Sequence, residues 1–186
     1  MRRFPEAERE IKIAQDLDPL SVIISLGVGE IQEWQRNYDA AYRQFQKTME
    51  LDPNFCGTYG HLATIYEHKG LLRDAMEQLK KIEVLKGHDS EAVEIDLAYK
   101  KAAYPGVTQF DARRDLDMKA QGKYVPALVI AEDYLRLGKK AEAYHWLEMA
   151  YEERDSGLAF LQVEAGFDSL RNDPQFQQLI KKIGLS

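Results

Sequence analysis

The chain of 186 residues is 45% hydrophobic and 30% charged, a composition typical of one folded domain with a substantial core. A formal net charge of −6 argues against nucleic acid as the main ligand, because phosphate binding requires a basic surface. The longest apolar stretch, residues 19–29, is too short to cross a bilayer and follows acidic residues. We therefore expect a cytoplasmic chain with no signal peptide and no membrane insertion, whatever the topology of a larger parent protein.

The first predicted element is an amphipathic helix over residues 3–17. Ala7, Ile11 and Ala14 follow one another at intervals of four and three residues, which places them on one helical face. Pro19 ends the helix, because its ring cannot continue the backbone hydrogen bonding. No helix precedes this one to cover the apolar face, so Ala7, Ile11 and Ala14 could serve self-association into a homodimer.

The same helical face returns with a period of 34 residues. Ala41, Ala75 and Ala143 lie one, two and four periods after Ala7. Further members of the face follow these alanines at the same intervals: Phe45 and Thr48, Leu79 and Ile82, and Leu147 and Ala150. A fixed period of this length is the signature of a tandem-repeat architecture in which each unit buries its apolar face against the next.

Each period also contains an earlier helix and a turn. Tyr66 and Tyr134 are 68 residues apart, which is two periods, and so are Gly70 and Gly138. The repeating unit is therefore helix, turn, helix. Full units are predicted over residues 21–51, 56–85 and 124–152, after a first half unit at residues 3–17.

The fourth unit, over residues 90–121, is degenerate. Ala112 and Leu116 fall three residues late against the period. The sequence YPGV at residues 104–107 is expected to lengthen the turn between its two helices, because proline and glycine both interrupt helices.

The chain ends in a segment that is not a repeat. Asp173 and Pro174 are typical of a helix start, while Lys181, Lys182 and Gly184 are typical of a helix end. A repeat array must cover its last open face, so we interpret this helix as a cap. The predicted domains are a repeat domain over residues 1–154 and a capping segment over residues 155–186.

The segment at residues 57–87 resembles the tetratricopeptide consensus. The matching positions are Tyr59, Leu62, Ala63, Tyr66, Gly70, Ala75 and Leu79. This resemblance implies an all-α, right-handed superhelix of helix-turn-helix repeats with a C-terminal capping helix. The sequences AQDLDPLSVII and WLEMAYEERD, with the tail FDSLRNDPQFQQLIKKIGL, are similar to the C-terminal repeat region of bacterial signalling and transcriptional regulator proteins. The chain is thus expected to be a non-enzymatic interaction scaffold within a larger protein.

The family resemblance also implies a concave groove lined by the first helix of each repeat. Its partner-binding positions correspond here to Leu26, Glu30, Glu33, Trp34, His61, Thr64, Glu67, His68, Leu128, Glu132 and Arg136. These side chains suggest a protein or peptide partner that combines basic and apolar residues. Two alternatives stay open: Trp34 could pack on its own repeat instead of anchoring a partner, and the glutamates could be ordinary solvated residues.

Catalytic and metal-binding patterns are not evident. His61 and His68 are seven residues apart, whereas a helix presents two zinc ligands at an interval of four. We therefore expect these histidines to be solvated or to face the groove. The glycines suit turns and close contacts, and no phosphate-binding loop or nucleophile motif occurs. We expect no enzyme activity, cofactor or metal, and the alternative function is a self-associating structural module.

Overall fold

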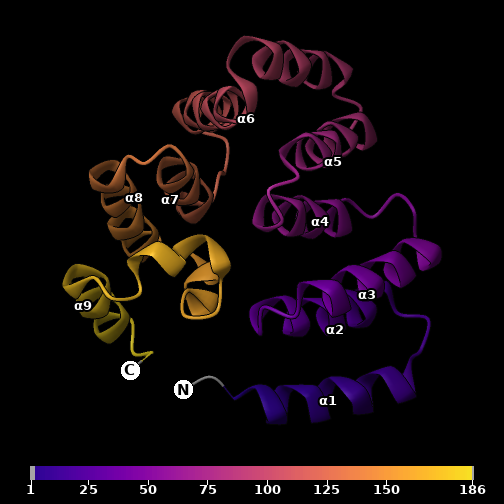
Figure 1. Cartoon of the computed structure of the whole chain (residues 1–186). Helices are drawn as coiled ribbons and strands as arrows, with labels where there is room; N and C mark the ends of the chain where they lie inside the picture. The colour runs from indigo at the N-terminus through magenta and orange to yellow at the C-terminus, as the bar shows by residue number, and fades with distance from the viewer. Residues whose placement is uncertain (1–2, 186) are drawn as a thin grey trace. The chain divides into compact units, whose positions relative to one another are not determined.

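The protein is described by a computed structural model that covers residues 3–185, and these residues form helices with no β-strand (Figure 1). The helices are α1 (Phe4–Leu17), α2 (Val22–Trp34), α3 (Tyr38–Leu51), α4 (Cys56–His68), α5 (Leu72–Leu85), α6 (Asp89–Ala120), α7 (Ala127–Arg136), α8 (Lys140–Glu152), η1 (Ser156–Phe160), η2 (Ala165–Leu170) and α9 (Pro174–Lys182). They pack in consecutive pairs, which confirms the prediction of an all-α, repeat-like architecture.

The described chain divides into two compact units, residues 3–100 and 101–185. In the first unit α1, α2, α3 and α4 each pack on the helix that follows, and α2 also contacts α4. The second unit contains residues 101–120 of α6, the pair α7 and α8, and the C-terminal segment. This division between compact units lies between Lys100 and Lys101.

The turns between the two helices of a repeat explain why glycine recurs at positions 70 and 138. Gly70 and Gly138 both have φ of +71°, a left-handed conformation that glycine adopts without strain. Arg36 occupies the equivalent position one period before Gly70 and has φ of +67°. Its guanidinium donates a hydrogen bond of 2.9 Å to the carbonyl oxygen of Trp34, which satisfies one of the last carbonyl groups of α2.

The first unit has a core between α2, α3 and α4. Ala41, Phe45 and Ile65 are fully buried, and Leu62 lies with them. Phe45 approaches the backbone of α2 so closely that a Cβ atom on Gly29 would lie 2.2 Å from its ring. Helix α2 can therefore pack on α3 only with glycine at this position.

Gly29→Ala is expected to destabilise the first unit by about 2 kcal/mol or more, because the new methyl group would overlap the ring of the fully buried Phe45. Gly60 provides a matched control in the middle of α4, since a Cβ atom there would meet nothing within 4 Å. Gly60→Ala should stabilise the helix by about 0.5–1 kcal/mol. Urea unfolding of both variants measures the difference, and equal effects would contradict the close approach.

Helix α6 is interrupted, which corrects the prediction for the degenerate unit. The non-helical residues are Ala102 and Ala103, the latter with φ of +52°. Residues 104–107 do not lengthen a turn but form the first turn of the following helical segment, where Pro105 needs no backbone donor. Tyr104 and Val107 are buried within this turn. The prediction was wrong because proline and glycine were assigned to a loop, although proline also suits a helix start.

The second unit has its core between α7, α8 and the C-terminal segment. The face of α8 that carries Leu147 and Ala150 is completely buried, in the same cluster as Phe167, Phe176 and Leu179. The Asp155 carboxylate accepts hydrogen bonds from the backbone N–H groups of Gly157 at 2.9 Å and of Leu128 at 3.3 Å. The segment predicted to be a cap therefore covers α8 and completes this core.

Candidate functional site

The residues predicted to bind a partner in the first unit lie on two contacting helices, α2 and α4. The structure brings His61 of α4 between two carboxylates of α2. Its Nε2 lies 3.0 Å from Oε1 of Glu30, and its Nδ1 lies 2.9 Å from Oε2 of Glu33. The ring also stacks on Phe45, with centroids 5.1 Å apart and planes inclined by 20°. His61 thus joins the two helices and rests on the core.

This arrangement determines the charge of His61. Burial opposes protonation, but hydrogen bonds to Glu30 and Glu33 outweigh it and raise the pKa of His61 to about 10. The imidazolium donates from both ring nitrogens at neutral pH, and the three side chains together carry one net negative charge. His61 is therefore not simply solvated, because both ring nitrogens are engaged by side chains from the neighbouring repeat.

The other predicted residues of this surface differ in their exposure. Glu33 is only 3% exposed and cannot present its side chain to a partner in this conformation. Leu26 is half-buried and packs on the core, and Trp34, Thr64 and Glu67 are also half-buried. His68 is exposed but stacks on the ring of Tyr38 with centroids 4.7 Å apart.

Leu128, Glu132 and Arg136 lie on α7 in the second compact unit. Leu128 belongs to the core of that unit and is 8% exposed, so it too is unavailable to a partner. Arg136 contacts Glu132 at 3.4 Å and Asp133 at 3.2 Å. The acidic character predicted for the groove is weaker than the sequence suggested, since Glu30 and Glu33 share His61 and Glu132 pairs with Arg136.

A buried carboxyl group at Asp133 was not predicted. Asp133 is 5% exposed, and its Oδ2 has no hydrogen-bond partner. Burial raises the pKa of Asp133 to about 7, and the charges of Asp111 and Asp115 add to this effect while Arg136 opposes it. The repeat register contained the signal, because Asp133 occupies the position held by Ile31 and Ile65 in earlier units, and both of those residues are buried.

Asp133→Asn is expected to stabilise the second unit at pH 8. Because the folded pKa of Asp133 lies above the unfolded value of 3.8, this carboxyl group lowers the free energy of unfolding as pH rises from about 4 to 7. The gain at pH 8 should be on the order of 1–4 kcal/mol, and it should vanish near pH 4. Urea unfolding at both pH values measures it. Asp117→Asn, at an exposed position, should have little effect at either pH, and a destabilised Asp133→Asn protein at pH 8 would refute the expectation.

The apolar face predicted for self-association is partly covered in the structure. Ala7, Ile11 and Ala14 are half-buried, and Ile11 packs on α2, where a Cβ atom on Gly27 would lie 3.2 Å from its Cδ1. The exposed apolar residues of α1 are instead Ile13 and Leu17. The prediction assigned the covered side of α1 to a missing helix, although α2 packs against it.

Residues 3–185 contain no helix that is long and apolar enough to cross a membrane. Within this described part of the chain, no three histidine, cysteine, aspartate or glutamate side chains are grouped so that they could hold a metal ion. Comparison of the sequence with protein-family models and with curated proteins finds no match.

Proposed function

We propose that the chain is a tetratricopeptide-type interaction scaffold, a right-handed superhelix that binds a segment of another protein and performs no catalysis. The observation that supports this proposal best is the shared surface of α2 and α4. Glu30, Trp34 and Glu67 lie on these two contacting helices, and the contact is fixed by the His61 imidazolium between Glu30 and Glu33. A surface held by partly buried ionic contacts is preorganised, which reduces the entropic cost of binding.

The chemistry of this surface favours a partner with apolar side chains and few basic ones. Trp34 and Leu26 offer apolar area, and large aromatic residues often dominate binding energy. Ion pairing leaves the surface only moderately acidic, so charge would affect encounter rate and specificity more than affinity. The repeat pattern and tail favour a role within a larger bacterial signalling protein.

A peptide-library capture with the whole chain tests the proposal. Trp34→Ala should weaken the selected peptides by about 30-fold, in line with the loss of a binding hot spot. Glu67→Lys should shift the captured set away from basic peptides, whereas Glu50→Lys on the exposed side of α3 should leave the set unchanged. If both surface variants capture the same peptides as the wild type with equal affinity, the proposed binding surface is rejected.

A self-associating structural module is the second candidate. Four apolar residues near the end of α1 and the start of α2 are from 50% to 82% exposed, namely Ile13, Leu17, Leu20 and Ile23. One period later three of these positions carry Lys47, Asn54 and Gly57. An apolar patch that is confined to one repeat favours a contact at that end. Sedimentation of the wild type and Leu17→Lys tests it, and a monomer in both at all concentrations excludes it.

A further inference from the structure

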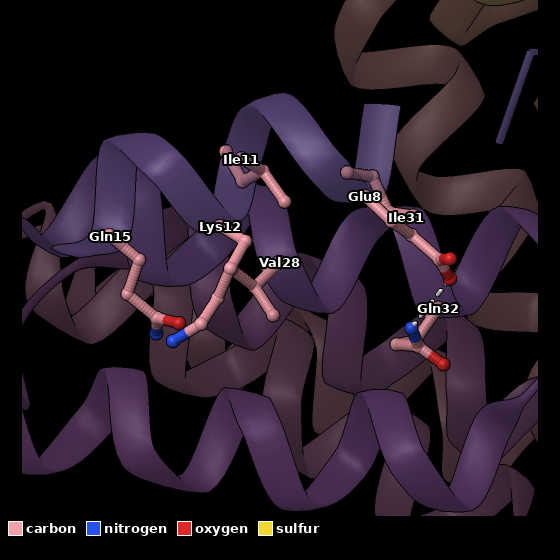
Figure 2. Close-up of a pocket in the computed structure, with 7 residues that line it drawn as sticks. All are labelled: Glu8, Ile11, Lys12, Gln15, Val28, Ile31 and Gln32. Atoms are coloured by element: carbon pink, nitrogen blue, oxygen red, sulfur yellow. Dashed lines mark hydrogen bonds between the residues drawn. The ribbon is translucent and has the colours of Figure 1, made fainter. Parts of the chain in front are cut away.

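A pocket of about 220 Å³ lies between α1 and α2 in the first unit (Figure 2). Its floor is apolar and comprises Ile11, Val28 and Ile31. Polar side chains surround the floor, and Figure 2 shows the hydrogen bond that joins two of them, Glu8 and Gln32. The polar lining residues are Glu8, Lys12, Gln15 and Gln32.

In the next repeat, larger side chains occupy the positions that correspond to this pocket. One period later, between α3 and α4, the floor residues correspond to Phe45, Leu62 and Ile65 of the core. Glu8 and Gln32 correspond to Tyr42 and Tyr66, and Gln15 corresponds to Met49. All three of these larger residues pack on the core, and the two tyrosine rings meet edge to face with centroids 6.0 Å apart.

The polar contact across the two helices is kept in both places. Between α3 and α4 the hydroxyl group of Tyr66 lies 3.5 Å from that of Tyr42. Between α1 and α2 the amide of Gln32 donates to Oε1 of Glu8 at 3.4 Å, and the amide of Gln35 donates to the same oxygen at 2.7 Å. The α1–α2 contact therefore keeps its polar link but lacks the volume of two aromatic rings.

We propose that this pocket binds the side chain of a tyrosine residue supplied by a partner protein. A volume of about 220 Å³ is below the range of cofactor sites but suffices for one aromatic ring, since a cavity of about 150 Å³ accommodates benzene. The apolar floor receives the ring, and the Glu8 carboxylate at the edge accepts a hydrogen bond from the phenolic hydroxyl group. Lys12, held 2.8 Å from Asp16, adds a donor at the same edge.

This site goes beyond the proposed α2–α4 surface, because it lies between α1 and α2. N-acetyltyrosinamide and N-acetylphenylalaninamide form a matched pair of probes that differ only in the hydroxyl group. Titrations are followed by methyl NMR signals of Ile11, Val28 and Ile31. The tyrosine probe should shift these signals with a dissociation constant of about 1–10 mM, and the phenylalanine probe should bind at least threefold more weakly. The Ile130 signals of the second unit should not move.

Filling the pocket should abolish binding. Glu8→Tyr combined with Gln32→Tyr reproduces the Tyr42 and Tyr66 pair and should weaken the tyrosine probe at least tenfold, while Glu50→Tyr should bind as the wild type does. If the double variant does not fold, as judged by the Leu62 and Ile65 signals, Gln15→Met provides the smaller filling and should weaken binding at least threefold.

Two results would overturn the assignment. The first is the absence of saturable shifts at Ile11, Val28 and Ile31, and the second is equal binding by the two probes, which would remove the role of the phenolic group. Trp34→Ala and Glu67→Lys should leave probe binding unchanged, so failure of the α2–α4 surface and failure of this pocket are separable.

Discussion

His61→Ala should destabilise the first compact unit by about 3–5 kcal/mol. The substitution removes the only imidazolium from between Glu30 and Glu33 while leaving Glu33 with 3% exposure. A buried carboxylate without its cation must be either desolvated as a charge or protonated, and each costs several kcal/mol at neutral pH. The stacking contact with Phe45 is lost as well.

The stability of the first unit should also fall in alkaline solution. The folded pKa of His61 is about 10, above the unfolded value of 6.5, so its contribution is fully present below pH 6.5 and is lost as pH rises through 10. Between these values the slope approaches about 1.4 kcal/mol per pH unit. Urea unfolding of the wild type and His61→Gln from pH 6 to 10 measures this, and equal slopes in the two proteins would show that the ring is not held as a cation.

Two controls separate the charge effect from simple truncation. Glu33→Gln combined with His61→Gln removes the buried charge together with its partner, and it should recover part of the loss. His68→Ala truncates the exposed histidine on the same helix and should cost less than about 1 kcal/mol. If His61→Ala and His68→Ala prove equally stable, the ion pairs contribute nothing measurable.

Phe176→Ala should destabilise the second compact unit by about 3–5 kcal/mol. Phe176 is fully buried on α9, beside Phe167 and against the apolar face of α8. Truncation leaves a cavity in a core that the C-terminal segment completes, and such cavities do not collapse fully. If the C-terminal segment detached, the face of α8 that carries Leu147 would become exposed and would favour aggregation.

Phe160→Ala is the matched control, because Phe160 belongs to the same segment but is 44% exposed. It should cost less than about 1 kcal/mol. Thermal and urea unfolding of the two variants, with light scattering to detect aggregation, measures both effects. Should Phe176→Ala melt together with the wild type, the C-terminal segment would not contribute to this core.

The period of 34 residues predicted most helices of both units with nearly correct bounds, because each helix carries its own apolar spacing. It could not predict the interruption of α6, where the choice between a loop and a helix start at Pro105 depends on tertiary contacts. The His61 cluster was missed for a related reason. Its carboxylates come from the preceding repeat, so the contact depends on how two helices pack rather than on spacing within one helix.

The buried carboxyl group and the pocket both lie where the sequence departs from the 34-residue repeat pattern. Aligned by the period, Asp133 stands among buried isoleucines, and Glu8 and Gln32 stand where the next repeat has tyrosines. Departures from the repeat pattern therefore indicate the buried carboxyl group and the pocket. The tertiary packing decides whether such a departure leaves a void or a repacked contact, because neighbouring side chains can compensate for lost volume.

The packing of each helix mainly on its neighbours in sequence has a consequence for folding kinetics. Contacts of this kind close only short loops, so the chain should fold rapidly, and folding can begin in any adjacent pair of helices. Since the interruption at Ala102 and Ala103 lies beside the division between the two compact units, cooperativity can end there. Denaturation would then proceed in two transitions, with a separate free energy of unfolding for each.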